Sequence, residues 1–295
     1  MPPKKNTVTA LQADSWEELK RCVHQCAEDL GKGPDEELWF RGAPSKLFRL
    51  APSLQRLFPD SPFDNEDVLN LENNLFFEFL SRARVDGTQA KDQWDVLFLM
   101  QHYRAPTRLL DWTTILHVAV YFALFSPCSN GCVPPCNHSV TRRIWVMNPY
   151  LWNEETQGER DLYWPRFIGW DEESEDYYDY DEILIDSGQM YWQSPIALYN
   201  PQTETRMAAQ RGYFTIHGTD VRPLDQQHPH LLRAIDLTPK AVQEAKEELE
   251  FSGTDDYRLF PDFEGLARTL RNRPLPAIAA KNLPRKRQML QRKSR

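Results

Sequence analysis

Apolar and polar positions in the first half of the chain repeat at the spacing of α-helices. One helix is predicted from Asp14 or Ser15, either of which can cap it, to Gly31, where the pattern stops. Further helices are predicted over residues 66–83, 94–102 and 113–125. The last of these segments is apolar on nearly every side, so we expect it to lie in the centre of the core.

Short runs of β-branched and aromatic residues replace the helical pattern in the second half. These runs predict strands over residues 143–147, 195–199, 213–217 and 232–237, after one early strand at 38–41. Two more helices are predicted, one capped by Thr238 and a short one after Pro261. Because helices come first and strands later, we expect an α+β fold: a helical N-terminal half packed on a mostly antiparallel sheet from the C-terminal half.

The domain boundaries follow from where these patterns begin and end. Residues 1–13 are expected to form a loose leader, and residues 14–272 a single main domain. Residues 126–141 and 153–190 fit neither pattern and are predicted to be insertion loops. Residues 273–295 are predicted to be a basic, disordered tail, because runs of like charge are usually unstructured.

The composition is that of a globular protein. Of the 295 residues, 41% are hydrophobic and 12% aromatic. No apolar run reaches the roughly 20 residues that a membrane span needs, and the first residues lack the apolar stretch of a signal peptide. The five cysteines form no regular framework, which suits a reducing compartment. We therefore expect a soluble, cytoplasmic protein with no membrane partner.

The charge is unevenly distributed along the chain. The net charge of −8 argues against general nucleic-acid binding. Residues 171–182 are densely acidic, whereas residues 281–295 carry only positive charges. Solvated, unstructured segments explain both runs. The alternative is that the basic tail is an arm for phosphate backbones or acidic surfaces, which is the one hint of a nucleic-acid partner.

Several motifs in a fixed order resemble the FRG domain family. The first is Phe40-Arg41-Gly42, and the most specific is QHYRAPTRLLDWT at 101–113, similar to the family's QHxGxPTRLLDWT block. They are followed by AVYFA at 119–123, RMAAQRGYF at 206–214 and LFPD at 259–262. The resemblance covers roughly residues 14–272 and identifies the chain as similar to FRG domain-containing proteins of bacteria and phages. It implies a role as an effector or phage-defence factor. One departure is Arg104, where the family usually has Gly, so the tight turn there is in doubt.

Arg41 and Gly42 are the first candidates for a binding site. A guanidinium is a fixed fork that grips phosphate or carboxylate with two parallel bonds. Gly42 allows a ligand or another backbone to approach closely. The alternative is that Arg41 pairs internally with a carboxylate, for which Asp111 is the obvious candidate.

The block at 101–113 concentrates polar groups between two apolar helices. Such side chains must be satisfied by one another or by a ligand. His102 could act as a general base, or be a buried histidine bonded to the backbone. Asp111 could instead be a helix N-cap, and Trp112 a core residue or a stacking wall. The candidate ligand-binding residues of this block are Gln101, Thr107, Arg108, Asp111 and Trp112.

A second group of candidates precedes the strand at 213–217. Arg206 and Gln210 are four residues apart and would share one face of a helical turn, next to Gly212 and Phe214. If Arg206 converged with Arg41 or Arg108, the guanidiniums would form a site for a polyanion such as a nucleotide pyrophosphate.

Two functions fit these residues. Arg41, which follows an aromatic residue, resembles the arginine that orients NAD in ADP-ribosyltransferases. NAD is therefore the candidate cofactor. The catalytic candidates are Arg41, His102 and Gln210. The usual Glu-x-Glu or Gln-x-Glu pair is missing, and Glu204 is the only carboxylate near Gln210. The alternative is a non-catalytic binding module whose motif residues form an internally satisfied polar cluster.

The loop after residue 125 holds a group of metal-ligand residue types. Their spacing, C-x3-C-x3-C-x-H, is not a common zinc-finger pattern, so no metal site is predicted, and zinc stays an alternative. The residues concerned are Cys128, Cys132, Cys136 and His138.

Overall fold

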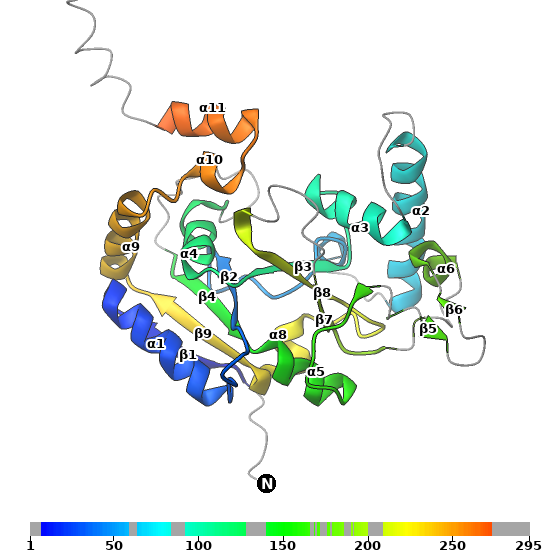
Figure 1. Cartoon of the computed structure of the whole chain (residues 1–295), viewed down its shortest axis with the longest axis horizontal. Helices are drawn as coiled ribbons and strands as arrows, with labels where there is room; N and C mark the ends of the chain where they lie inside the picture. Colours follow the sequence, from blue (N-terminus) through cyan, green and yellow to red (C-terminus); the bar gives the residue numbers. More distant parts are fainter. Residues whose placement is uncertain are drawn as a thin grey trace, which may run out of the picture.

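A seven-stranded sheet runs through the centre of the protein (Figure 1). The computed structural model describes residues 7–58, 64–83, 92–127, 140–165, 168, 170–171, 176–177, 179–185, 190, 192–199 and 209–272. The strands lie in the order β1-β9-β4-β2-β3-β8-β7. They are β1 (Thr9–Ala13), β2 (Trp39–Ala43), β3 (Leu109–Thr113), β4 (Arg142–Met147), β7 (Ile196–Leu198), β8 (Gly212–Ile216) and β9 (Leu232–Leu237). Among the strand pairs of the described residues in this sheet, β1–β9 alone is parallel, so the predicted α+β class and mostly antiparallel sheet are confirmed.

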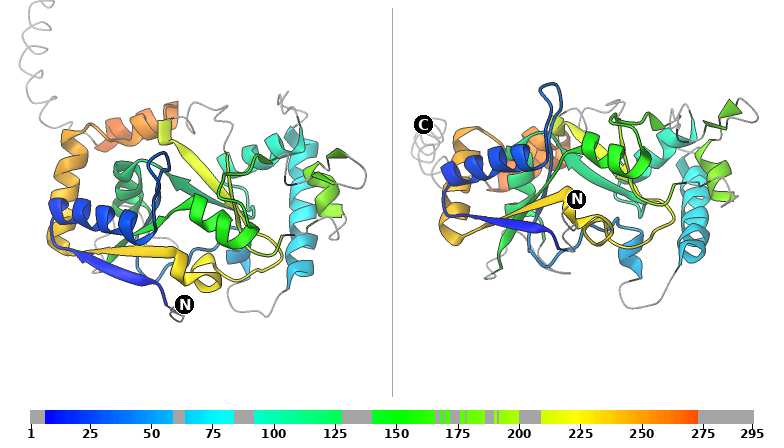
Figure 2. Two further views of the ribbon diagram at one scale, coloured as in Figure 1. Left: turned by 60° about the horizontal axis from the view of Figure 1, so that its bottom comes forward. Right: turned by 90° about the horizontal axis from the view of Figure 1, so that it is seen from below.

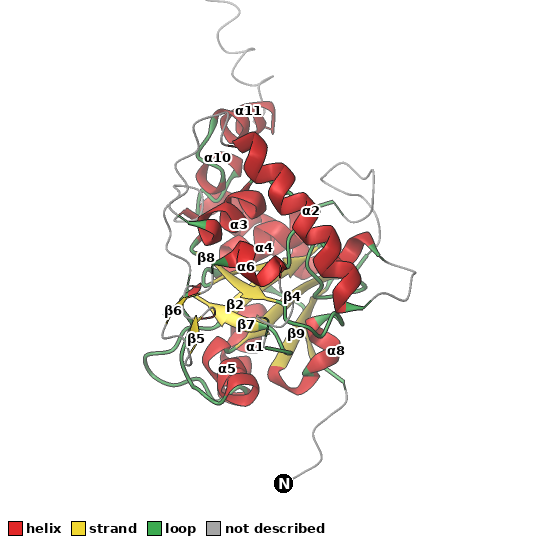
Figure 3. Ribbon diagram, turned by 90° about the vertical axis from the view of Figure 1, so that its right-hand side faces the viewer, coloured by secondary structure: helices red, strands yellow, loops and turns green. Residues whose placement is uncertain are grey.

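Two groups of helices pack on one face of the sheet. The first group covers β9, β4 and β2, and Figure 2 shows α1 and α9 side by side there. It contains α1 (Trp16–Asp29), α4 (Leu116–Phe125) and α9 (Pro239–Phe251). The second group packs on β3, β8 and β7. It contains α2 (Asn65–Ala83), α3 (Gln93–His102) and α6 (Tyr180–Ile185), and Figure 3 shows its members with α4 on this face.

The opposite face carries α5 (Pro149–Gln157) and α8 (Leu224–Gln227) (Figure 3). A tryptophan-rich cluster fills the space beneath them and includes Trp39, Trp112, Trp145 and Trp152. The remaining elements are η1 (Gln55–Leu57), the short pair β5 (Trp170–Asp171) and β6 (Asp176–Tyr177), η5 (Pro229–Leu231), α10 (Asp256–Leu259) and α11 (Phe263–Asn272). Among the described residues, no helix combines the length and the apolar character that a membrane crossing requires.

Local capping explains where the helices begin. The side chain of Ser15, not Asp14, accepts a hydrogen bond from the amide of Glu18 at 3.1 Å and caps α1. Thr238 caps α9, whose first residue is Pro239, as predicted.

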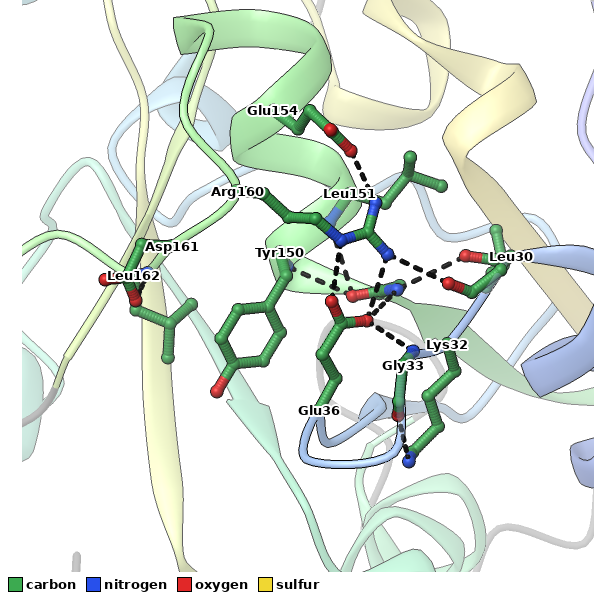
Figure 4. A network of polar contacts seen from close by, with 12 residues as sticks. Leu30, Lys32, Gly33, Glu36, Tyr150, Leu151, Glu154, Arg160, Asp161 and Leu162 are labelled. Carbon is green, nitrogen blue, oxygen red and sulfur yellow. Dashed lines mark hydrogen bonds and ion pairs between the residues drawn. The ribbon is translucent and has the colours of Figure 1, made fainter.

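A polar network fixes the loop that leads into β2 (Figure 4). The Glu36 carboxylate accepts hydrogen bonds from the Gly33 amide at 2.8 Å, from Asn148 Nδ2 at 2.9 Å and from Arg160 Nε at 2.7 Å. Arg160 also pairs with Glu154 on α5. The network therefore joins the end of α1, the start of β2 and α5, and holds β2 in place.

Three predictions about the N-terminal half are wrong in detail. Residues 9–13, expected in a loose leader, form the edge strand β1. Residues 109–113, expected to lead into and start a helix, form β3, and α4 begins only at Leu116. The sheet is therefore not confined to the C-terminal half, because β1, β2 and β3 come from the N-terminal half. Leu110 and Trp112 are buried on one face of β3 and Leu109 on the other, which hides the alternation that marks a half-buried strand.

Part of the predicted insertion loop 153–190 packs into the core. Tyr180 and Ile183 of α6 are fully buried against α2 and α3, together with Met190. Its acidic residues concealed this role in the sequence. Of the other predicted insertion loop, 126–141, residues 128–139 lie outside the described residues, as does the tail 273–295.

Candidate functional site

A cavity of about 460 Å³ opens between the two groups of helices. Its apolar wall comes from β2, α4 and β8 and includes Phe40, Val118, Phe122 and Phe214. Its polar wall comes from β2, η1, the end of α3 and β3, and includes Arg41, Ser53, Arg56, Gln101, His102, Arg104 and Asp111. The cavity therefore brings together residues from four of the five FRG-like motifs.

The cavity lies where the sheet splits between β2 and β3. β2 pairs with β4 along its whole length but with β3 only at Phe40–Thr113. Arg41 spans the gap, because its Nη1 donates to the backbone carbonyl oxygen of Asp111 at 2.5 Å and lies 3.3 Å from Oδ2. The expected internal partner of Arg41 is thus confirmed.

Arg41 keeps hydrogen-bonding capacity beyond this pairing. Both contacts use Nη1, so Nε and Nη2 make no hydrogen bond with a described residue. The Arg41 and Asp111 side chains are 25% and 56% exposed. A ligand in the cavity can therefore still be gripped by the free edge of the guanidinium.

Gln101 and Thr107 extend this contact into the protein. Gln101 Nε2 donates to Asp111 Oδ1 at 2.8 Å, and Thr107 Oγ1 donates to Gln101 Oε1 at 2.5 Å. Thr107 is buried and does not line the cavity, so its role in ligand binding stays a prediction without support from the cavity. Its role is to orient Gln101, whose amide in turn orients Asp111.

Arg108 does not join the site. Its guanidinium is buried against α2, where Nε donates to Glu72 Oε2 at 2.6 Å. Tyr180 Oη donates to Glu72 Oε1 at 2.6 Å, and burial, reinforced by that carboxylate, raises the pKa of Tyr180 well above its usual range. Arg108 therefore holds α2, β3 and α6 together and does not line the cavity, so its role in ligand binding stays a prediction.

Two arginines that the motif analysis did not select as binding residues line the cavity instead. Arg56 on η1 donates Nη1 to the carbonyl of Ala51. Partial desolvation, then the nearby charge of Arg41, lower its pKa, while Asp111 acts in the opposite direction. Arg104 has a φ of 63°, so the turn that suits glycine is retained with an arginine in it. No local pattern marked Arg56, whereas Arg104 stood out as a departure from the family block.

The charges around the cavity do not balance. Among its described lining residues there are three arginines, Arg41, Arg56 and Arg104, and one carboxylate, Asp111. Even without a proton on His102, the lining is positively charged.

Gly42 lines the cavity and also allows close packing of α4 on β2. A Cβ atom at this position would lie 1.8 Å from the carbonyl oxygen of Ala119 and 2.5 Å from the amide nitrogen of Ala123. Gly42 therefore allows another backbone, that of α4, to approach β2 closely. The glycine of the motif seats α4 on β2.

The candidates on β8 and β3 have mixed roles. Gln210 lines the cavity, but its Nε2 donates to the carbonyl of Leu259 on α10 at 2.8 Å. Gly212 also lines the cavity, and Phe214 stacks on Phe98 with ring centroids 5.4 Å apart. Trp112 is a core residue, since its indole is buried and donates to Thr215 Oγ1 at 3.2 Å.

His102 lines the cavity at the end of α3. Its ring contacts that of Tyr103, with centroids 4.9 Å apart. Arg206 lies outside the described residues, as do the zinc candidates Cys128, Cys132, Cys136 and His138. Within the described part of the chain, no group of three His, Cys, Asp or Glu residues is arranged to hold a metal ion.

The comparisons with known proteins identify one family. The model of the FRG domain matches residues 36–131, which include β2, α3, β3 and α4 and therefore most of the cavity. No curated protein matches the chain, and no solved structure does.

Proposed function

Because this chain is an FRG domain-containing protein, we propose that the cavity between β2 and β3 of the domain binds a small anionic ligand of the nucleotide type. One observation carries the proposal. Arg41 reaches into the cavity with Nε and Nη2 unbonded to any described residue, next to two further arginines and a single carboxylate.

The size and the lining of the cavity support a nucleotide. Small-molecule sites commonly span about 300–1,000 Å³, and this cavity is about 460 Å³. Phe40, Phe122 and Phe214 offer aromatic contacts for a base or sugar ring, while the arginines suit phosphate. A ligand with both an apolar ring and a phosphate group would use both walls.

NAD has both features, and we propose it as the first ligand to test. The arginine after an aromatic residue, at the split in the sheet, supports chemistry like that of ADP-ribosyltransferases. In that reaction the bond between the ribose and the nicotinamide nitrogen breaks, and nicotinamide leaves. The ADP-ribose joins the oxygen of water or of an acceptor hydroxyl, and the proton of that oxygen is released. His102 is the candidate base, and Asp111 is the carboxylate present in the cavity.

A second candidate function is a non-catalytic module. The chain of bonds from Arg41 through Asp111 and Gln101 to Thr107 favours it, because these side chains already satisfy one another. In this case the motif stabilises the domain, and the cavity recognises a partner or a nucleotide signal without turnover.

Calorimetric titration with NAD, combined with measurement of released nicotinamide, tests the proposal. We expect the wild-type protein to bind NAD, and Arg41→Ala to lose binding without a large change in melting temperature. Arg21→Ala, a change at an exposed arginine on α1, is the matched control and should bind as the wild type does. Loss of nicotinamide release in Arg41→Ala would support catalysis. A wild-type protein that neither binds nor cleaves NAD, with a melting temperature several degrees lower in Arg41→Ala, would favour the non-catalytic module.

A further inference from the structure

Arg104 holds an unfavourable backbone conformation at the edge of the cavity. Among the described residues other than glycine, Arg104 and Arg211 have positive φ angles, of 63° and 39°. An L-residue in this region carries conformational strain that glycine would avoid. Strain of this kind persists when the surrounding structure or the function requires that particular side chain.

The two strained arginines differ in what their side chains do. Arg211 does not line the cavity and lies 3.9 Å from the Glu37 carboxylate. Arg104 lines the cavity and is exposed, and its side chain makes no hydrogen bond or ion pair with a described residue. No contact within the described part of the chain therefore accounts for an arginine at position 104.

The position of Arg104 complements that of the other two arginines. Arg41 comes from β2, Arg56 from η1 and Arg104 from the turn after α3, so the three guanidiniums approach the cavity from different elements. Asp111 is bonded to Arg41 and neutralises part of its charge. The one carboxylate of the described lining is thus engaged by Arg41, which leaves the charges of Arg56 and Arg104 for a ligand.

We propose that Arg104 is a ligand-binding residue of the cavity and that, with Arg41 and Arg56, it selects a diphosphate over a monophosphate. This inference rests on the proposed anion-binding function. Two adjacent phosphoryl groups can be contacted by three guanidiniums at once, whereas a single phosphoryl group held between Arg41 and Arg56 leaves Arg104 without a partner. The strained arginine thus sets the ligand class of the cavity.

Calorimetric titration with inorganic pyrophosphate and with inorganic phosphate tests this inference. In Arg104→Gly we expect binding of pyrophosphate to weaken about 10–100-fold, as for the loss of a charge-assisted bond, and binding of phosphate to change less than about threefold. Removal of the strain should leave the melting temperature unchanged or raise it by roughly 2–4 °C. The second variant is Arg104→Asn, because asparagine tolerates the left-handed region.

Arg211→Gly is the matched control, because it removes the other strained arginine. It should bind both anions as the wild type does. If Arg104→Gly and Arg104→Asn bind pyrophosphate as tightly as the wild type, the role of Arg104 is wrong while the anion site stands. If both anions weaken equally, the selection of a diphosphate is wrong. If the wild type binds neither anion, the proposed function itself fails.

Discussion

Nη1 of Arg41 donates a hydrogen bond to the backbone carbonyl oxygen of Asp111 across the gap between β2 and β3. A side chain thus takes a place that a backbone amide would fill in a continuous ladder. The sheet can split at this point without leaving that carbonyl unsatisfied. The same arginine therefore closes the gap in the sheet and forms the polar wall of the cavity.

Glu72 should be essential for stability, because it is the buried partner of Arg108. Removing one member of a buried ion pair costs about 3–5 kcal/mol, so we expect Glu72→Gln to lower the free energy of unfolding by that amount in a urea titration. Glu78→Gln on the same helix removes an exposed partner of Arg82 and should cost less than about 1 kcal/mol. Equal losses in the two variants would show that the buried pair does not hold α2 to β3.

Gly42 should tolerate no side chain. In Gly42→Ala the new methyl group meets the α4 backbone at 1.8 Å, so β2 and α4 must separate. We expect little soluble protein, or a loss of several kcal/mol in urea unfolding. Gly158→Ala provides the comparison. Its φ of 87° makes alanine unfavourable by about 1–2 kcal/mol, but nothing lies within 4 Å of the added group. A milder effect at Gly42 than at Gly158 would contradict the packing role.

The free energy of unfolding should decrease as the pH falls from 6.5 towards about 3, because of His217. Burial, then the nearby positive charge of Arg108, lower the pKa of His217 from 6.5 to about 3. The folded protein keeps this imidazole neutral below pH 6.5, whereas the unfolded chain takes up a proton. Its contribution to the unfolding free energy is therefore lost as the pH falls, at up to about 1.4 kcal/mol per pH unit within this window.

The variant His217→Leu isolates this contribution. Urea unfolding between pH 7 and pH 4.5 should show a shallower loss of stability in His217→Leu than in the wild type. The exposed His24 on α1 provides the control His24→Leu, which should follow the wild-type curve. Parallel curves for wild type and His217→Leu would mean that His217 is not held neutral.

Gln210 should anchor α10 next to the cavity. Its Nε2 donates to the carbonyl of Leu259, so Gln210→Leu should increase hydrogen exchange in α10 and α11 while β9 stays protected. Gln243→Leu removes an exposed glutamine bonded to Glu247 on α9 and should leave α10 unchanged. Unchanged exchange in Gln210→Leu, together with lost activity, would instead support the catalytic role that its sequence position suggests.

Local signals in the sequence predicted much of the fold. Ser15 and Thr238 cap their helices with their own side chains, and β9 is found at the predicted residues 232–237. β3 was missed because Leu109 and Leu110 are buried on opposite faces of the sheet. A strand that is apolar on both sides cannot be separated by its pattern from the apolar helix that follows it.

The candidate site was predicted less completely, because its members come from distant segments. The motifs correctly brought Gln101 and Asp111 to Arg41. The internal pairing of Arg108 was not foreseen, because its partner, Glu72, lies 36 residues earlier in an ordinary amphipathic helix. Arg56 carried no local signal at all, since only the fold brings η1 to the cavity. Tertiary contacts of this kind leave no mark in a single sequence.

A crystal structure of the protein with ADP-ribose at saturating concentration tests the anion site most directly. We expect the ligand to lie in the cavity between β2 and β3. Phosphoryl oxygens should lie within about 3 Å of the Nε or Nη2 atoms of Arg41, with Arg56 and Arg104 on the same diphosphate. An empty cavity under these conditions, or a ligand bound elsewhere, would contradict the account.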